Sequence, residues 1–527
     1  MNCRILIVDA LSTGTGKRQS SRDTIGCGPR AVAGVLERRG LECRIRRAEE
    51  VLSATSPFRG FDHLAISAMT MDLPSVRRIA GIWRRTRHSG RVLVGGPITA
   101  DPSILPDTLA DLFIVGEGEG TLDELIGSGY LDGRVDFSSV KGLAFMRSGR
   151  VETSEPRPLL TEQQISEEYT PSVSRIVDYR AYEASKVYVE VIRGCSNYQR
   201  TRLPLRDGKQ CTECGNCDSA DPELRMECPE QIPPGCGFCS VPWTWGPPRS
   251  RSVESIVQEV QDLVNLGVHR VVLEAPGFLD YHRGPWPVTD PCSPPANTEA
   301  IARLLEGLNS IPQVASGDVH LGIENIKACL FTEDVAQMLV DSSMSSSPNI
   351  GLETGSDEHL RQIGKCGSTA DVTEAVRIAS KFGMKPFVYF IYGLPGETDS
   401  TVDASIEMMK QLCADGAERI ILYGFRPLPG SAFERLPAPS PDDSHGQRLV
   451  REAERINRSK KSDYVGMLVE GIAAEPSWSR HGYTMVYPLT EGPLMTVAGG
   501  YTPGTRLFVR ITSVLSSGLL LGEVESN

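Results

Sequence analysis

Two short segments decide the fold of this chain, Glu190-Val-Ile-Arg-Gly-Cys195 and Cys236-Gly-Phe-Cys239. Their three cysteines can gather around one iron-sulfur cluster, because each thiolate binds a different iron. A four-iron cluster then keeps one iron without a protein ligand, and a small molecule with amino and carboxylate groups can chelate that iron. The pattern therefore predicts redox chemistry at an open iron. The alternative for a Cys-x2-Cys pair is half of a structural zinc site.

Together with the run Trp245-Gly-x-x-Arg-x-Arg-Ser, these segments resemble the radical S-adenosylmethionine (SAM) superfamily. The resemblance implies a 4Fe-4S cluster on the three cysteines, with SAM at the open iron and Phe238 at the SAM site. The usual spacing in the superfamily is Cys-x3-Cys-x2-Cys, whereas 40 residues separate Cys195 from Cys236 in this chain. Cys228 lies eight positions before Cys236 and is the rival for the place of the first ligand.

Residues 250–435 have the order of strands and helices that a barrel of repeating strand-helix units requires. Apolar residues recur at helical spacing from Val253 to Val264, and a short apolar strand follows at His269–Leu273. The resemblance extends through this region. It implies a central radical SAM partial (β/α) barrel with SAM bound at the ends of its strands.

Three strand ends of this region resemble the SAM-binding segments of the superfamily. The bend Gly393-Leu394-Pro395-Gly396-Glu397 follows a strand, and its glycines let the backbone approach an adenine ring because no side chain intervenes. Glu353 is expected to accept hydrogen bonds from the ribose hydroxyls, or else to pair with a nearby Arg or Lys. Glu274 is expected to meet the methionine amino group, although the Ala-Pro-Gly that follows it differs from the usual motif.

The first 128 residues alternate short apolar strands with amphipathic helices. Strands are expected at residues 4–8, 63–66, 91–94 and 111–115, and helices near residues 30–39 and 74–87. This alternation predicts an α/β domain with a doubly wound, Rossmann-like parallel sheet over residues 1–150.

The loops after these strands resemble those of cobalamin-binding domains. Such loops lie at Ser67-Ala-Met69, at Gly95-Gly96-Pro97 and at Gly116-Glu117, and 25 residues separate Met69 from Gly95. The resemblance implies that these loops hold the nucleotide tail of a corrinoid. The axial-ligand motif Asp-x-His-x-x-Gly of that family is missing, because the chain has Asp9-Ala-Leu-Ser-Thr-Gly14 without histidine. The alternative is a scaffold domain that binds no cobalamin.

The segment between Cys195 and Cys236 holds a second group of four cysteines, which are Cys211, Cys214, Cys217 and Cys228. The Cys-x2-Cys-x2-Cys run with a later Cys-Pro resembles a ferredoxin ligand set and predicts an auxiliary iron-sulfur cluster. A tetrahedral zinc site is the equal alternative, since four thiolates close it and would fold a polar insert. An insert with idle thiols is a third possibility.

Composition shifts divide the rest of the chain. Residues 151–182 are polar with three prolines and predict a linker. The radical SAM barrel is expected over residues 183–436 with the insert 196–235, and a linker helix over 437–462. Residues 463–527 resemble a TRAM-type small β-barrel, a domain that often contacts RNA. Its acidic residues outnumber its arginines, so the alternative is a barrel that caps the active site or packs against the first domain.

The composition is that of a large enzyme without a membrane span. The chain has 527 residues, 40% of them apolar, a formal net charge of -12 and 14 cysteines. No signal peptide or apolar run of spanning length is expected, and the cysteines clustered at 195–239 favour metal ligation in a reducing, cytoplasmic compartment. The negative charge argues against tight nonspecific binding of nucleic acid, but it leaves a specific RNA open.

The resemblance implies reductive cleavage of SAM, hydrogen abstraction from an unactivated carbon and methyl transfer from cobalamin to that carbon. It also implies an electron donor such as ferredoxin or flavodoxin. We therefore expect a radical SAM methyltransferase. The enzymatic alternative is radical C-C or C-S bond formation, such as lipid cyclisation or RNA methylthiolation. The non-enzymatic alternative is an RNA-binding protein whose cysteines hold structural metal.

Overall fold

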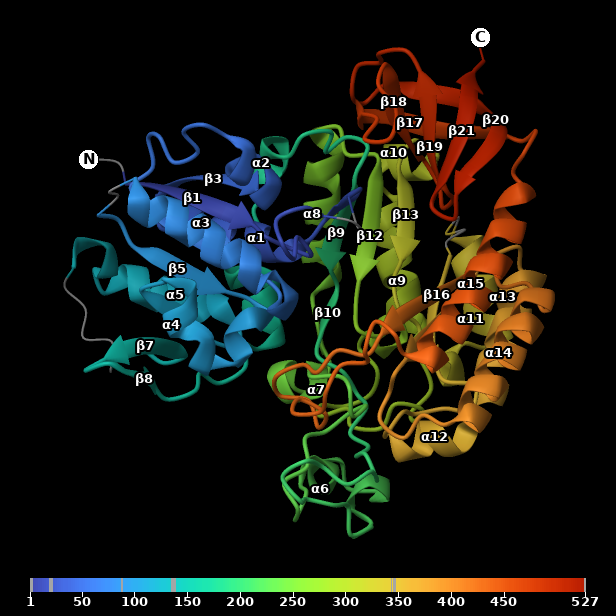
Figure 1. Cartoon of the computed structure of the whole chain (residues 1–527), viewed down its shortest axis with the longest axis horizontal. Helices are drawn as coiled ribbons and strands as arrows, with labels where there is room; N and C mark the ends of the chain where they lie inside the picture. Colours follow the sequence, from blue (N-terminus) through green and yellow to red (C-terminus); the bar gives the residue numbers. More distant parts are fainter. Residues whose placement is uncertain are drawn as a thin grey trace. The chain divides into compact units, whose positions relative to one another are not determined.

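A computed structural model describes residues 3–18, 22–86, 89–133, 139–342, 344 and 347–525 (Figure 1). The chain divides into two compact units. The first unit comprises Met1–Tyr182 with Gln261–Leu266, and the second comprises Glu183–Val260 with Gly267–Asn527. Within the described ranges, every helix is too short or too polar to cross a membrane.

The first unit is built on a seven-stranded sheet flanked by helices. Its strands are β1 (Arg4–Asp9), β3 (Glu42–Arg47), β4 (His63–Ser67), β5 (Val92–Gly95), β6 (Leu112–Ile114), β7 (Leu143–Arg147) and β8 (Arg150–Thr153), in the order β3-β1-β4-β5-β6-β7-β8. Its helices are α1 (Cys27–Arg38), α2 (Ala48–Ser53), α3 (Leu73–Arg85), α4 (Leu105–Thr108) and α5 (Gly118–Gly127). The predicted doubly wound α/β fold is confirmed. Arg87, the expected last residue of the second helix, lies outside the described residues.

The last two strands of this sheet differ from the predicted all-parallel arrangement. β1, β3, β4, β5 and β6 are parallel, whereas β7 and β8 run antiparallel to their neighbours. Ser148 and Gly149 join β7 to β8 with φ of 51° and 79°. Two consecutive positive φ values are typical of the tight turns that connect hairpins, so the local turn fixes the antiparallel pairing.

The core of the first unit lies between α3 and the sheet. Val76, Ile79 and Trp83 on α3 are fully buried, and they belong to one apolar cluster with Leu6 and Val8 of β1. The indole N–H of Trp83 donates a hydrogen bond to the carbonyl of Gly90 at 3.2 Å, so the one polar atom of this ring is satisfied inside the core.

The second unit contains a partial barrel of six parallel strands. The strands are β9 (Lys186–Glu190), β12 (Arg270–Glu274), β13 (His320–Ile323), β14 (Asn349–Glu353), β15 (Phe387–Tyr392) and β16 (Arg419–Gly424). β12 pairs with β9 and β13, β15 pairs with β14 and β16, and a bridge between Ile326 and Ile350 joins the two groups. The predicted partial (β/α) barrel is confirmed.

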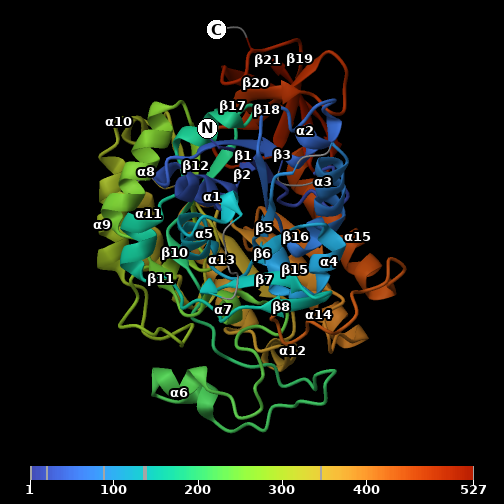
Figure 2. The same cartoon turned by 90° about the vertical axis from the view of Figure 1, so that its left-hand side faces the viewer.

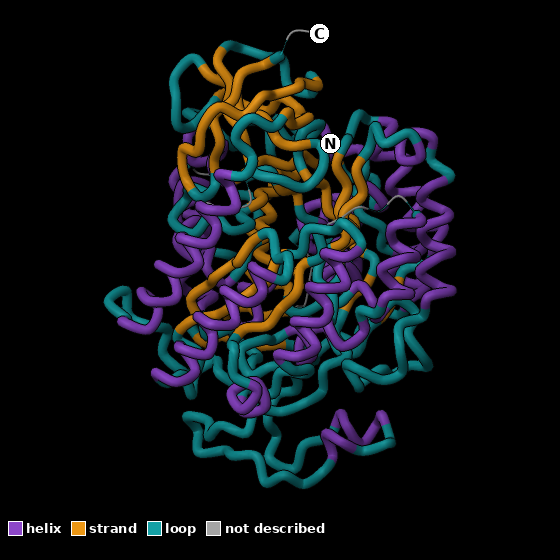
Figure 3. Tube along the Cα trace, turned by 90° about the vertical axis from the view of Figure 1, so that its right-hand side faces the viewer, coloured by secondary structure: helices purple, strands orange, loops and turns teal. Residues whose placement is uncertain are grey.

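Helices cover the outer face of this barrel (Figure 3). They are α8 (Val253–Asn265), α9 (Thr298–Asn309), α10 (Pro312–Ala315), α11 (Glu333–Asp341), α12 (Asp357–Gln362), α13 (Thr369–Lys381), α14 (Asp399–Ala414) and α15 (Ser444–Ser462). The cysteine-rich insert extends from the barrel as a loop-rich lobe that includes α6 (Pro222–Met226) (Figure 2). The segment after it forms α7 (Val241–Trp245), and β11 (Arg249–Ser250) pairs with β10 (Ile192–Arg193).

The end of the chain folds into a closed five-stranded barrel, as predicted for a small β-barrel. Its strands are β17 (Leu468–Pro476), β18 (Tyr483–Pro488), β19 (Leu494–Ala498), β20 (Arg506–Ser516) and β21 (Leu519–Val524), closed in the order β17-β18-β19-β21-β20. Val486, Met495, Val509 and Leu520 fill its interior. The TRAM assignment of this barrel stays a prediction.

Ion pairs attach the small barrel to the amino-terminal ends of the large-barrel strands. Glu491 pairs with Lys186, the first residue of β9, at 2.9 Å. Arg506 pairs with Asp318, two residues before β13, at 2.6 Å. Cys195 follows the opposite, carboxyl-terminal end of β9, so the expectation that the small barrel caps the iron site is wrong.

We predict that His320 makes the stability of the second unit depend on pH. Burial lowers the pKa of His320 to about 4, so the folded protein keeps the ring neutral where the unfolded chain, with a pKa near 6.5, takes up a proton. The stability that the neutral His320 contributes is therefore present above about pH 6.5 and is lost as the pH falls towards 4. His320→Asn should flatten the fall of the thermal unfolding midpoint between pH 6.5 and 4, whereas substitution of the exposed His481 should not. An unchanged slope in His320→Asn would contradict this.

Candidate functional site

The first cysteine follows a glycine that the fold requires. Gly194 has a φ of +93°, and a Cβ at this position would lie 2.3 Å from the carbonyl oxygen of Pro247. The N–H of Cys195 donates a hydrogen bond to the carbonyl of Gly246 at 3.0 Å. The turn after β10 is therefore held against the segment that precedes β11, which fixes the backbone of Cys195 at the carboxyl end of the barrel.

The Cys-x2-Cys pair forms a tight turn that is packed against an aromatic ring. The N–H of Cys239 donates to the carbonyl of Cys236 at 2.8 Å, and Gly237 exchanges backbone hydrogen bonds with Ile363 and Phe433. A Cβ at Gly237 would lie 2.4 Å from the ring of Phe433. Glycine is therefore required between the two cysteines.

Asn197 links the two halves of the cysteine motif. Its backbone N–H donates to Sγ of Cys195 at 3.5 Å, and its side-chain Nδ2 donates to Sγ of Cys236 at 3.3 Å. The N–H of Val241 donates to Sγ of Cys239 at 3.5 Å. N–H groups directed at sulfur stabilise the charge that a thiolate carries when it binds iron. The 40-residue insert thus leaves the cysteines together.

The three thiols are protonated until a metal binds. Burial raises the pKa of Cys195 and Cys236, and it raises the pKa of Cys239 to about 11. Among the described residues, no three His, Cys, Asp or Glu side chains are arranged to hold a single metal ion. A 4Fe-4S cluster requires a wider arrangement of ligands than a single ion does, because each thiolate binds its own iron. This donor set fits such a cluster.

A buried ion pair lies beside the cysteines. Nζ of Lys365 lies 2.9 Å from Oε1 of Glu353, the last residue of β14. Burial disfavours the Lys365 ammonium, but the charge of Glu353 outweighs that cost and raises the pKa of Lys365. The alternative that the sequence left open for Glu353, a basic partner, is therefore present. Its role towards ribose stays a prediction.

Glu353 also has an unusual backbone. Its φ of +74° lies in the left-handed region, where any residue other than glycine is strained. The register of β14 against β15 shifts at this point. Strain of this kind persists where the surroundings over-determine a conformation, which is common at binding sites.

The glycine-rich bend after β15 is closed by its own glutamate. The N–H of Gly393 donates to Oε2 of Glu397 at 3.0 Å, and burial raises the pKa of Glu397. Gly396 has a φ of +84°, and a ring nitrogen of His359 contacts the carbonyl of Pro395 at 2.8 Å. Leu394 is buried. The bend is thus a rigid turn at the same end of the barrel as the cysteines.

Phe238 and Glu274 also lie at this end. Phe238 packs against the apolar cluster of Ile363, Leu394, Phe425 and Phe433. Glu274 ends β12, and its backbone carbonyl accepts a hydrogen bond from the N–H of Val191 at 2.9 Å. The structure therefore brings the predicted SAM residues to one rim, while their contacts with SAM stay predictions.

A charged network next to Cys195 was missed in the sequence. Asp280 is buried, and its carboxylate accepts hydrogen bonds from Ser196 at 3.0 and 3.1 Å and pairs with Arg283 at 2.9 Å. Lys327 also pairs with Asp280. Asp280 raises the pKa of Lys327 despite its burial, so the ammonium remains charged beside Cys195. These residues come from separate loops without a shared motif, so only the folded chain reveals them.

The insert cysteines are partly ordered by their own backbone. Sγ of Cys211 accepts a hydrogen bond from the N–H of Glu213 at 3.4 Å, and the carbonyl of Cys228 accepts from Gln231 at 2.9 Å. Burial raises the pKa of Cys217, and Cys211 and Cys214 raise it further. An iron-sulfur cluster, zinc or idle thiols at Cys211, Cys214, Cys217 and Cys228 stay the three alternatives that the sequence predicts.

In the first unit, the predicted cobalamin loops follow neighbouring parallel strands. Ser67 ends β4 and Gly95 ends β5, and Ala68 donates its N–H to the carbonyl of Gly95 at 3.1 Å. Gly96 has a φ of +91°, and a Cβ there would lie 2.7 Å from the carbonyl oxygen of Ala68. Gly96 is therefore explained by the fold itself.

The fold itself does not explain why position 95 is a glycine. A Cβ at Gly95 would meet only Cβ of Ile114, at the ordinary contact distance of 4.0 Å, and its φ is not positive. A Cβ at Gly116 would meet no protein atom within 4 Å, but its φ of +77° by itself favours glycine. Bare backbone at the carboxyl ends of strands suits a ligand that approaches the main chain closely.

Two other predicted cobalamin residues have protein partners. Oε2 of the buried Glu117 accepts a hydrogen bond from the N–H of Leu160 at 2.5 Å. Met69 donates its N–H to the buried Asp72 at 2.9 Å, and Asp72 also accepts from Ser12 and Gly14. The loop after β1, which lacks the axial histidine, is thus held by Asp72. Pro97 begins the short 3-10 helix Pro97–Ala100.

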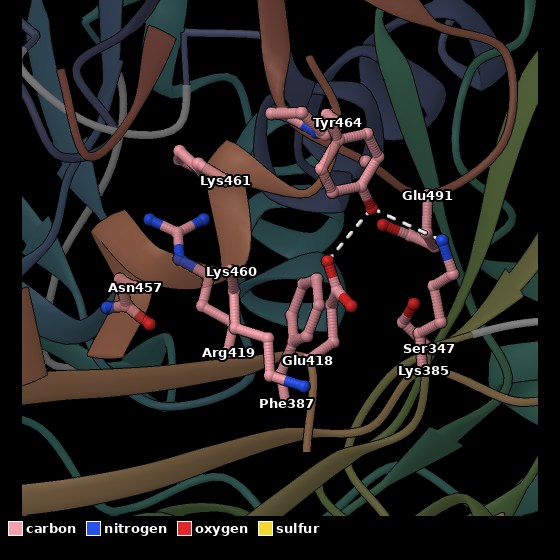
Figure 4. Close-up of a pocket in the computed structure, with 12 residues that line it drawn as sticks. Ser347, Lys385, Phe387, Glu418, Arg419, Asn457, Lys460, Lys461, Tyr464 and Glu491 are labelled. Carbon is pink, nitrogen blue, oxygen red and sulfur yellow. Dashed lines mark hydrogen bonds between the residues drawn. The ribbon is translucent and has the colours of Figure 1, made fainter. Parts of the chain in front are cut away.

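A small cavity lies at the opposite end of the large barrel (Figure 4). Its volume of about 20 Å³ has room for roughly one water molecule, so it cannot hold SAM. Tyr464 joins two of its charged residues, accepting a hydrogen bond from Lys385 at 3.2 Å and donating one to Glu418 at 2.8 Å. Arg419 and Lys461 also line it.

Comparison with known proteins gives one family and two near relatives. The model of the radical SAM superfamily matches residues 228–409. The Methanopyrus kandleri protein MK0932 is 39% identical over 99% of this chain and 96% of its own. The Methanocaldococcus jannaschii protein MJ1620 is 38% identical over 94% of each chain. More distantly, the tRNA-2-methylthio-N(6)-dimethylallyladenosine synthase of Clostridium novyi is 24% identical over 46% of this chain and 51% of its own.

Among solved structures, the fold is similar to that of TsrM, a radical SAM methyltransferase from Kitasatospora setae. The match has a TM-score of 0.59 at 15% identity and covers 82% of this chain and 75% of TsrM. A second TsrM structure, with cobalamin and a 4Fe-4S cluster bound, matches with a TM-score of 0.58. The chain therefore belongs to the radical SAM superfamily and, within it, to the family of MK0932 and MJ1620.

Proposed function

We propose that this radical SAM enzyme is a cobalamin-dependent methyltransferase that methylates an unactivated carbon. The observation that carries the radical SAM part of the proposal is the pair of hydrogen bonds by which Asn197 joins Cys195 to Cys236 across the insert. For this reason we take Cys195, rather than Cys228, as the first cluster ligand. When bound, the 4Fe-4S cluster supplies the electron that cleaves SAM, and cobalamin supplies the methyl group.

The protein's own residues would bind and orient SAM. In this proposal the Lys365 ammonium, which stays charged near Cys236, pairs with the SAM carboxylate. Glu353 would then release Lys365 and accept hydrogen bonds from the ribose hydroxyls of SAM. The turn from Gly393 to Glu397 would offer its backbone to adenine, and the apolar cluster around Phe238 would exclude water, which protects a carbon radical from quenching.

The cobalamin part of the proposal rests on the first unit. The fold similarity to TsrM covers 82% of the chain, and Gly95 and Gly116 leave backbone open at the strand ends. Because the loop after β1 offers no histidine, the corrinoid would be bound without that axial ligand. A ferredoxin or flavodoxin as electron donor and a cytoplasmic location belong to the same proposal, whereas RNA binding by the C-terminal barrel is a separate prediction.

RNA methylthiolation is the second candidate, and the distant similarity to the Clostridium novyi synthase favours it. It differs from methyl transfer in its product, since sulfur as well as carbon is added. Mass analysis of the product separates the two.

Cys236→Ala should abolish cluster binding and SAM cleavage. Loss of one of three thiolates leaves an iron without its ligand, so we expect the iron content of anaerobically purified protein to fall and 5'-deoxyadenosine formation with dithionite to drop at least about a hundredfold. Cys413→Ala, on the remote helix α14, is the matched control and should resemble the wild type. Full iron content and turnover in Cys236→Ala would refute the proposal.

Lys365→Met should weaken SAM binding without loss of the cluster. A lost charge-assisted hydrogen bond costs about 1.5–3 kcal/mol, so the Kd for SAM should rise about tenfold to a hundredfold. The measurement is equilibrium dialysis of reconstituted protein with radiolabelled SAM. Lys381→Met, which removes an exposed partner of Glu333, should leave the Kd unchanged. Equal affinity in Lys365→Met would exclude this lysine from the SAM site.

Gly95→Leu should prevent cobalamin binding while the fold remains. The neighbouring protein atoms leave room for a Cβ at this position, so the side chain should obstruct a ligand rather than a strand. Wild-type protein loaded with hydroxocobalamin and desalted should retain about one cobalt per chain by metal analysis, as expected for one site. Gly500→Leu is the control, because Gly500 is exposed and a Cβ there would meet no protein atom within 4 Å. Absence of cobalt from the wild type would contradict the cobalamin proposal and leave the radical SAM assignment intact.

A further inference from the structure

Three cysteines outside both predicted metal sites meet at the carboxyl end of the large barrel. Cys292 lies in the loop between β12 and α9, Cys329 lies in the 3-10 helix Ala328–Leu330 after β13, and Cys366 lies between α12 and α13. Each therefore follows a different, consecutive strand. Their distance in sequence concealed them, because no spacing motif connects them.

The sulfur atoms are in contact. Sγ of Cys292 lies 2.6 Å from Sγ of Cys329, not far from the about 2.05 Å of a disulfide bond. Cys366 lies next to both, and its pKa responds to each of them. All three are free cysteines, and Cys292 is exposed to solvent, so a small reagent can reach the group.

The loop that carries Cys292 is held in place. Oδ1 of Asp290 accepts hydrogen bonds from the N–H of Cys292 at 2.9 Å and from that of Ser293 at 3.0 Å. Asp290 also pairs with Arg225 of the insert at 2.7 Å. Sγ of Cys329 lies 3.7 Å from the carbonyl of Pro291. The sulfur contact is therefore built into the loop.

Cys366 is set up as the nucleophile of the group. Hydrogen bonds with Cys292 and Cys329 hold its pKa well below the usual value, and the charges of Lys365 and Lys327 add to this against the effect of burial. The thiolate is the form that attacks a disulfide, so a stabilised thiolate next to a thiol pair is typical of exchange sites.

We propose that Cys292, Cys329 and Cys366 form a thiol-disulfide exchange site for a small-molecule disulfide. Cys292 and Cys329 lose two protons and two electrons and form a disulfide, while the small disulfide is reduced to two thiols. The Cys366 thiolate then attacks Sγ of Cys329 and releases the Cys292 thiolate, with no net change in electrons. The sulfurs are too close to share one metal ion, in agreement with the absence of a single-ion site among the described residues.

The site has a consequence for the neighbouring iron site. The charge of Cys366 acts on both Cys195 and Cys236. Exchange that converts the Cys366 thiolate into a disulfide moves its negative charge to the released Cys292 thiolate, which is exposed and can take up a proton from solvent. This step does not depend on the proposed methyl transfer.

The experiment uses full-length, anaerobically purified protein equilibrated with reduced and oxidised glutathione at a series of ratios. Acid quenching, alkylation and trypsin follow, and Arg303, Lys327 and Lys365 place the three cysteines on separate peptides. We expect a Cys292–Cys329 linked peptide to rise with the oxidised fraction. In Cys292→Ala, a Cys329–Cys366 peptide should replace it, because Cys366 contacts Cys329. Cys413→Ala should resemble the wild type.

Two outcomes would overturn the site. In one, all three cysteines stay alkylatable at every ratio, which would mean that the contact has no redox chemistry. In the other, the protein retains zinc that Cys292→Ala, Cys329→Ala and Cys366→Ala each lose, with no linked peptide, which would make the group a metal site. Failure of the cobalamin or SAM experiments would leave this result unaffected.

Discussion

The parallel arrangement of the large-barrel strands is the constraint on which the site depends. Because all six strands run in one direction, every loop that leaves a carboxyl end reaches the same rim. Cysteines, a lysine and a glycine-rich turn that are far apart in sequence thus become neighbours. Antiparallel strands would send alternate loops to opposite ends. The rim carries the predicted cluster ligands, the Lys365–Glu353 pair and the exchange site, so its chemistry follows from topology as much as from motifs.

Charge balance explains why two buried lysines stand at this rim. A cluster held by three thiolates brings negative charge into a poorly solvated region, where an uncompensated charge is costly. Lys327 and Lys365 stay protonated there because Asp280 and Glu353 pair with them. Glu353 balances Lys365, whereas Asp280 is shared by Lys327 and Arg283, so that group carries a net positive charge before a cofactor binds. If Glu353 turns from Lys365 to the ribose, as proposed, the Lys365 cation becomes available to SAM. The number of buried charges does not change.

The features of the fold that could be predicted are those that a local sequence pattern or a family motif determines. The alternation of strands and helices in the first unit was expected because hydrophobic periodicity is a local signal, and the partial barrel and the closed C-terminal barrel were expected from resemblance to known families. The β7–β8 hairpin was not expected, since its register depends on two positive φ values at Ser148 and Gly149. The network around Asp280 and the contact of Cys292 with Cys329 were also missed. They join residues from separate loops, and only the closure of the barrel brings such residues together.

The two ends of the large barrel differ in role, because one is packed against the C-terminal barrel and the other carries the candidate site. At the amino ends, Glu491 and Arg506 bind Lys186 and Asp318, and the cavity there has room for little more than one water molecule. That end is closed by the C-terminal barrel, which stabilises the strands without contributing to the rim. Any RNA bound by that small barrel would meet the end of the strands opposite to Cys195. RNA substrates would therefore have to extend past the barrel to reach the iron site, whereas a substrate that enters directly at the rim would not. The position of the small barrel thus favours methylation of a substrate other than RNA held by that domain.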